Sequence, residues 1–136
     1  MRTGRVLIVD DEPYVRNGLN RLLRGEFETV VAEDGEDALL RIENKEHFHV
    51  IICDVQMARI SGPSFRDSVR RLAPHLADRI IFLTGCADPE LKKTIEDHLI
   101  LTKPFVAEEL RSLVRSVATA AIGGYFPRRD VRKQLT

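Results

Sequence analysis

Polar residues of complementary chemistry follow four of the short apolar runs in this sequence. Asp10 and Asp11 follow the first run, Asp54 the third, Thr84 the fourth and Lys103 the fifth. If the runs are parallel strands, these side chains meet where open α/β sheets bind ligands, at the carboxyl ends of the strands. Each residue alone is also explained as a helix cap, a turn residue or a loop lysine. Their convergence therefore carries the prediction of a site.

The chemistry that this set predicts is metal-assisted phosphoryl transfer. Neighbouring carboxylates repel each other unless a cation joins them, and hard oxygen donors suit Mg²⁺. The ion would offset negative charge on a transferring group, while Asp54 could act as a covalent nucleophile, as in aspartyl-phosphate enzymes. Lys103 supplies a second positive charge and Thr84 a hydroxyl for a phosphoryl oxygen. Gly85, without a side chain, keeps the approach to Asp54 open.

The elements that must position these residues alternate between strand and helix. Apolar runs predict strands over 6–9, 27–32, 48–53, 80–83 and 99–101. Apolar spacing predicts a helix between Pro13 and Gly25 and further helices near 38–42, 65–72, 89–97 and 110–117, with Asp34-Gly35 as a turn. This alternation indicates an α/β fold, a doubly wound parallel sheet with helices on both faces.

Composition places the chain among single globular domains. It has 136 residues, of which 43% are hydrophobic and 31% charged, and 21 basic residues balance 21 acidic ones. The balance argues against a nucleic-acid footprint on the whole domain. Neither a membrane span nor a signal peptide is recognisable, so no membrane association is expected. With two cysteines, Cys53 and Cys86, we expect no disulfide framework and a cytoplasmic location.

Four segments in register resemble the receiver domain of two-component response regulators, which are CheY-like proteins. The segments are Val9-Asp10-Asp11-Glu12, Asp54-Val55-Gln56-Met57, Leu83-Thr84-Gly85 and Thr102-Lys103-Pro104-Phe105. Asp54 follows Asp11 by 43 positions and Thr84 follows Asp54 by 30, spacings that are similar to the family's. The resemblance covers about residues 4–120 and implies a flavodoxin-like sheet in the order 2-1-3-4-5 with five helices.

The resemblance also implies how the site would work. Asp54 would accept a phosphoryl group from a sensor histidine kinase or a phosphotransfer protein. Asp11, Asp54 and the backbone carbonyl of Gln56 would ligate Mg²⁺, with Asp10 acting through water. Lys103 would pair with the phosphoryl group through a loop in which the Lys103-Pro104 peptide is cis. Such a domain is a signalling switch and not a turnover enzyme.

The implied output is a change of protein contacts. Thr84 would move toward the phosphoryl group, and a homodimer could form through the fourth helix, the fifth strand and the fifth helix. Residues 1–121 would form the receiver domain, and residues 122–136 a linker or tail that could lead to an output domain absent from this sequence. Residues 125–136 carry a net charge of +3. Nucleic acid is therefore expected only through that tail or an output domain.

Three features depart from the family pattern. Ala58 stands where the family usually has proline, which predicts a looser loop after the third strand. Only 19 positions separate Thr84 from Lys103, so the fourth helix or its loops must be shorter than usual. Ile100 stands where the family usually has an aromatic residue that swings inward on activation. An isoleucine has no polar tip to exchange between water and interior, which predicts a muted or rerouted output face.

Two other functions remain open from the sequence. The same fold could serve as an interaction module that works without phosphorylation. An aspartate-nucleophile phosphatase would carry a second acid two positions after the nucleophile, where this chain has Gln56. The histidines form no metal pair and suggest surface or packing roles: His47, His49, His75 and His98. Cys53 is predicted to be a small core residue, and Cys86 to border the site.

Overall fold

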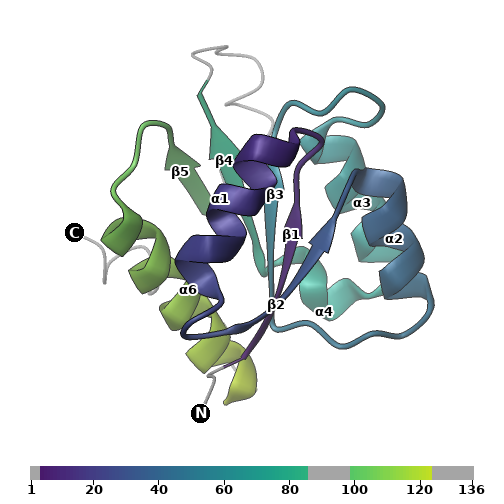
Figure 1. The fold of residues 1–136 in the computed structure, drawn as a ribbon. Helices are drawn as coiled ribbons and strands as arrows, with labels where there is room; N and C mark the ends of the chain where they lie inside the picture. Colours follow the sequence, from purple (N-terminus) through teal and green to yellow (C-terminus); the bar gives the residue numbers. More distant parts are fainter. Residues whose placement is uncertain (1–3, 86–98, 124–136) are drawn as a thin grey trace.

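Ten helices and strands make up the part of the chain that the computed structural model describes, residues 4–85 and 99–123 (Figure 1). In chain order they are β1 (Arg5–Val9), α1 (Pro13–Leu23), β2 (Glu28–Ala32), α2 (Gly35–Glu43), β3 (Val50–Asp54), α3 (Gly62–Leu72), α4 (Pro74–Ala77), β4 (Ile80–Thr84), β5 (Leu99–Thr102) and α6 (Ala107–Ile122). The helix predicted over 89–97 and Cys86 lie outside the described residues.

The five strands form one parallel sheet in the order β2-β1-β3-β4-β5, which confirms the predicted topology. The register pairs Val9 with Cys53, Asp54 with Leu83, and Thr84 with Thr102. The strands therefore end nearly level with one another. Asp54 and Thr84 are the last residues of β3 and β4. These two polar residues therefore belong to the sheet itself and not to the loops beyond it.

Helices cover both faces of the sheet (Figure 1). Val6 and Ile8 pack with α1 and α6, while Leu7 and Val9 pack with α2, α3 and α4. Successive side chains of a strand point to opposite faces, and all four residues are at most 1% exposed. A strand covered on both sides must be apolar throughout, which explains why β1 is an unbroken apolar run.

Helices α1 and α2 begin at residue types that favour the start of a helix. Pro13 is the first residue of α1, which ends at Leu23, two residues before Gly25. Asp34 caps α2: its side chain accepts a hydrogen bond from the Asp37 backbone N–H at 2.8 Å. The Asp34-Gly35 pair predicted as a turn is therefore the start of a helix. Among the described residues, no helix is both long enough and apolar enough to cross a membrane.

The short helix α4 was not predicted from the sequence. It follows α3 directly and is held by Arg66, a residue only 6% exposed. The Arg66 Nε donates to the backbone oxygen of Ala77 at 3.2 Å, and its Nη2 pairs with Asp78 Oδ1 at 3.3 Å. An arginine is expected at the surface, so the sequence gives no sign that this one ties two helices together.

Candidate functional site

Asp54 lies at the carboxyl edge of the sheet, between β1 and β4, and is held through both of its carboxylate oxygens. Oδ1 accepts a hydrogen bond from the Gln56 backbone N–H at 2.9 Å. Oδ2 pairs with Lys103 Nζ at 3.3 Å. The Asp54 side chain is 17% exposed, so it is sheltered by its neighbours and still accessible. A carboxylate oriented in this way is available as a nucleophile or as a metal ligand.

Lys103 reaches Asp54 from the loop that follows β5. Its backbone N–H donates to the oxygen of Thr84 at 2.8 Å, which continues the ladder between β4 and β5 by one residue. The Lys103-Pro104 peptide is cis, as expected. A Cβ added at Gly85 would lie 3.7 Å from the Lys103 side chain, an ordinary contact distance. Gly85, directly after β4, therefore lies beside Lys103, which pairs with Asp54.

Asp10 is buried at the end of β1, with 1% exposure. Its Oδ1 accepts a hydrogen bond from the Glu12 backbone N–H at 2.9 Å. Its Oδ2 is buried and has no hydrogen-bond partner among the described residues. Burial raises the pKa of Asp10, the Glu12 N–H opposes that rise, and the charge of Asp54 adds to it. A buried carboxylate oxygen without a partner is costly, and a bound cation or its water would satisfy it.

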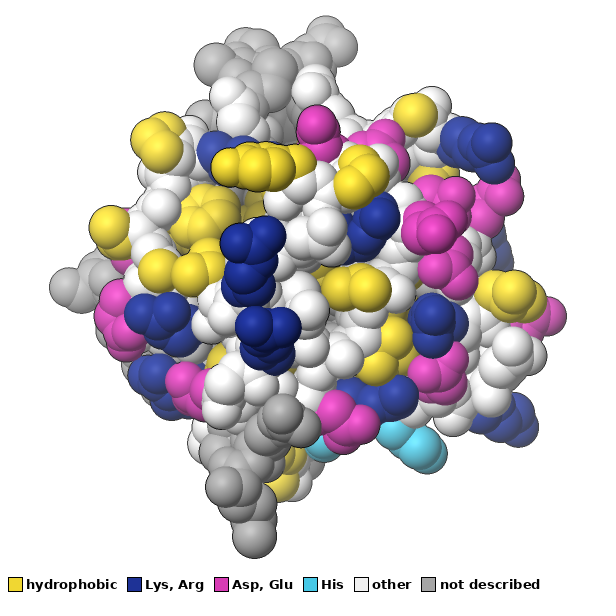
Figure 2. All heavy atoms as spheres, viewed as in Figure 1, with side chains coloured by type: hydrophobic (Ala, Val, Ile, Leu, Met, Phe, Trp, Pro, Cys, Tyr) yellow, Lys and Arg dark blue, Asp and Glu magenta, His cyan; other side chains and the backbone are white. Residues whose placement is uncertain are grey.

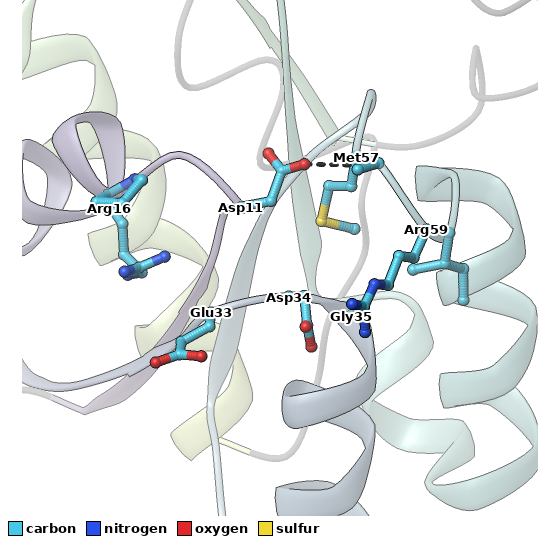
Figure 3. A pocket seen from close by; sticks show the side chains of 10 residues that line it. Asp11, Arg16, Glu33, Asp34, Gly35, Met57 and Arg59 are labelled. Carbon is cyan, nitrogen blue, oxygen red and sulfur yellow. Dashed lines mark hydrogen bonds between the residues drawn. The ribbon is translucent and has the colours of Figure 1, made fainter.

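Asp11 is exposed and contacts the loop between β3 and α3. Its Oδ2 accepts a hydrogen bond from the Ala58 backbone N–H at 2.8 Å (Figure 3). Among residues 4–85 and 99–123, no three acidic, histidine or cysteine side chains lie close enough to form a metal site as they stand. Asp10, Asp11 and Asp54 fit Mg²⁺ in the chemistry of their oxygen donors, but their side chains would have to rearrange to hold it.

The two predicted switch residues, Thr84 and Ile100, lie in β4 and β5. Thr84 is 3% exposed, at the end of β4 beside Asp54 in the next strand. Ile100 lies in β5 opposite Phe82 and packs, partly buried, against the core under α2, α3 and α4. Its side chain thus lies at the boundary between interior and surface.

Cys53 and His49 have the packing roles expected of them. Cys53, directly before Asp54, is fully buried, and burial raises the pKa of its thiol well above the ordinary range. His49 is at the opposite end of the sheet, where its Nδ1 accepts a hydrogen bond from the Arg5 backbone N–H at 2.9 Å. His98 lies outside the described residues. His47 and His75 are exposed.

A cavity of about 390 Å³ lies next to Asp11, between the starts of α1 and α2 and the loop before α3 (Figure 3). Its lining includes Arg16 and Arg59. Arg16 donates from Nη1 to the backbone oxygen of Asp10 at 2.9 Å and so supports the end of β1. Nothing in the sequence separates Arg16 from Arg21, the other arginine of α1, so this role could not be predicted.

The face that carries α1 and α6 mixes positive, negative and hydrophobic side chains, with no continuous field of one sign (Figure 2). This agrees with the balanced composition of the chain.

The fold is a doubly wound parallel sheet, and its acid–lysine site lies at the carboxyl edge. This combination is that of response regulator receivers. The family model described as "Response regulator receiver domain" matches residues 6–115, and the chain belongs to that family.

Curated relatives are similar to this chain over only part of their own length. The hydrogenase transcriptional regulatory protein HoxA of Bradyrhizobium diazoefficiens is 40% identical over 116 residues, which is 82% of this chain and 23% of the relative. The response regulator protein FleR of Pseudomonas aeruginosa is 32% identical over 124 residues, or 88% of this chain and 25% of the relative. This chain therefore spans about a quarter of the length of either protein.

Two solved structures match this chain over nearly their whole length. The chemotaxis protein CheY4 of Vibrio cholerae is 32% identical with a TM-score of 0.73, covering 83% of this chain and 97% of that one. The response regulator protein TrrA of Thermotoga maritima, solved in complex with Mg²⁺ and BeF, is 29% identical with a TM-score of 0.73, covering 86% and 99%.

Proposed function

We propose that Asp54 accepts a phosphoryl group from a histidine of a sensor kinase or phosphotransfer protein, with Mg²⁺ as cofactor. The observation that carries the proposal is the pairing of Asp54 Oδ2 with Lys103 Nζ at 3.3 Å beside the buried Asp10. In the transfer, an Asp54 oxygen bonds to phosphorus as the N–P bond of the phosphohistidine breaks. The electron pair of that bond stays on the histidine nitrogen.

Each neighbour of Asp54 has a defined part in this proposal. The Gln56 N–H holds one carboxylate oxygen of Asp54 in place. Lys103 would offset the negative charge of the phosphoryl group as that group bonds to Asp54. Asp11, Asp54 and the Gln56 carbonyl would hold Mg²⁺ directly, with Asp10 acting through water. When bound, the ion supplies positive charge that stabilises the transferring group. The unpartnered Asp10 Oδ2 and the Mg²⁺ named in the TrrA complex support this assignment.

The signal would leave the site through Thr84 and β5. Thr84 would follow the phosphoryl group, and the resulting shift would favour one of two surface states. Ile100 has no polar tip to exchange between water and interior, so the switch would rely on the movement of Thr84 alone. A homodimer through the predicted helix over 89–97, β5 and α6 is one contact that such a shift could control.

We propose a cytoplasmic setting for the domain. The chain would act in the cytoplasm as a signalling module and not as a turnover enzyme. Residues 1–121 would form the receiver and 122–136 a linker or tail, a division supported by the end of α6 at Ile122. HoxA is named a transcriptional regulatory protein and is much longer than this chain, which supports contact with nucleic acid through an output domain.

The test is incubation of the full chain with a small phosphodonor, with and without Mg²⁺, followed by intact mass spectrometry. We expect a mass gain of one phosphoryl group that depends on Mg²⁺ and disappears in Asp54→Asn. Asp67→Asn, an exposed acid on α3, is the matched control and should be labelled like the natural chain. If the natural chain gains no mass, or if Asp54→Asn gains as much, the function is not phosphoryl acceptance at Asp54.

A further inference from the structure

The loop over 55–61 is tied to Asp11 by one backbone hydrogen bond. The Ala58 N–H donates to Asp11 Oδ2 at 2.8 Å, across 47 positions of sequence (Figure 3). Both residues are exposed, so no packing of the two side chains accounts for the contact. A charge-assisted hydrogen bond of this kind is stronger than one between neutral groups.

This bond exists because residue 58 is not a proline. Proline has no backbone N–H and cannot donate, and proline is the residue that receivers usually carry at this position. The structure shows a donor at this position, and that donor holds the carboxylate of Asp11.

The loop positions this donor through contacts of its own. At its far end the Gly62 N–H donates to the Val55 oxygen at 2.8 Å. In between, Ile60 packs so closely on the start of α2 that a Cβ added at Gly35 would lie 2.3 Å from Ile60 Cγ2. The loop therefore fixes the position of the Ala58 N–H, and the Asp11 side chain has to reach that position to accept the hydrogen bond.

Asp11 held at Ala58 is not arranged with the other acids for a metal. Among the described residues, Asp10, Asp11 and Asp54 do not converge closely enough to form a site, although their residue types suit Mg²⁺. We infer that the Ala58 N–H is a latch that competes with the metal: Asp11 must leave it to become a ligand. This inference rests on the proposed function, in which Asp11 ligates Mg²⁺.

The latch should weaken Mg²⁺ binding by the strength of one partly solvated, charge-assisted hydrogen bond. That corresponds to about a five- to tenfold effect on the dissociation constant. Ala58→Pro removes the N–H, fixes the φ angle of residue 58 and restores the residue usual in the family; it should bind Mg²⁺ about five- to tenfold more tightly. Ala58→Ser keeps the N–H and should match the natural chain to within about twofold.

The experiment is calorimetric titration of Mg²⁺ into the full chain and both variants, with an NMR titration of the natural chain. Saturating Mg²⁺ should move the Ala58 amide proton upfield and speed its exchange with solvent, because its acceptor departs. The NMR measurement needs no variant and so stands even if Ala58→Pro misfolds. An Ala58 amide that Mg²⁺ leaves unchanged overturns the latch, as does Ala58→Pro binding no more tightly than the natural chain.

The same titration, carried out also on Asp54→Asn, separates failure of the latch from failure of the proposed function. If Asp54→Asn binds Mg²⁺ as well as the natural chain, or if neither binds it, the metal site itself is wrong and the latch falls with it. If Asp54→Asn loses Mg²⁺ while Ala58→Pro equals the natural chain, the site stands and only the latch is refuted.

Discussion

Gly62 is a position where a single added carbon should disturb the backbone that supports the site. It is the first residue of α3 and is buried. A Cβ built there would lie 2.9 Å from Phe82 Cε1 and 3.0 Å from the Cα of Val55, the residue after Asp54. Backbone cannot rotate away as a side chain can, so α3 or the end of β3 has to move.

The size of the effect follows from this crowding. Overpacking of a buried site costs about 1–3 kcal/mol, and the helix propensity of alanine recovers little at a first helical residue. We expect Gly62→Ala to lower the free energy of unfolding by about 2 kcal/mol. Gly18 is the matched control, because a Cβ there has nothing within 4 Å. Gly18→Ala in α1 should raise stability by about 0.5–1 kcal/mol.

Urea unfolding followed by circular dichroism measures both changes, and amide spectra locate the disturbance. In Gly62→Ala the amide signals of Gln56 and Ala58 should shift, because their loop is anchored at Gly62. Two results would refute the reasoning. One is a Gly62→Ala variant as stable as the natural chain. The other is equal destabilisation by Gly62→Ala and Gly18→Ala, which would mean that local crowding does not decide the effect.

Three further predictions concern titration and reactivity. Burial lowers the pKa of His49 below 6.5, so the unfolded chain binds the proton first and stability falls as pH drops below about 6.5; His49→Gln should reduce that loss in urea unfolding at about pH 7 and 5.5. Cys53, fully buried with a raised thiol pKa, should escape alkylation in the folded chain and react after unfolding, as peptide mass spectrometry would report; labelling of the native residue would contradict its burial. Arg115 lowers the pKa of Glu26 below 4.5, so their contribution is present above that pH and lost as pH falls through the folded value. Arg115→Ala should cost about 0.5 kcal/mol at neutral pH and nothing in strong acid.

The sheet could be predicted because its strands are covered on both faces. Burial on two sides forces an unbroken apolar run such as β1, and a polar residue directly after such a run marks the carboxyl edge. Asp54 and Lys103 were found in this way, and the structure joins them at 3.3 Å. The order of strands came from the resemblance, since apolar runs alone do not say which strand lies beside which.

The features that could not be predicted depend on contacts that residue types alone do not indicate. Helix α4 is a single turn held by the buried Arg66, and a residue type that is usually exposed predicts no such role. Arg16 supports the end of β1 by donating to a backbone oxygen. A backbone oxygen is present in every residue, so the sequence does not indicate this contact. The bond from Ala58 to Asp11 uses a main-chain N–H. The absence of proline was visible in the sequence, but the acceptor was not.

The central claim is that Asp54, and no other acid at the edge of the sheet, carries the phosphoryl group. Borohydride reduces an aspartyl phosphate to homoserine and leaves free aspartate unchanged, so it marks the acceptor permanently. Treating the chain with a phosphodonor and Mg²⁺, then with borohydride, and sequencing the peptides by mass spectrometry identifies the position. The account predicts homoserine at position 54 alone, and only with Mg²⁺. Homoserine at position 10 or 11, or at none, would contradict it.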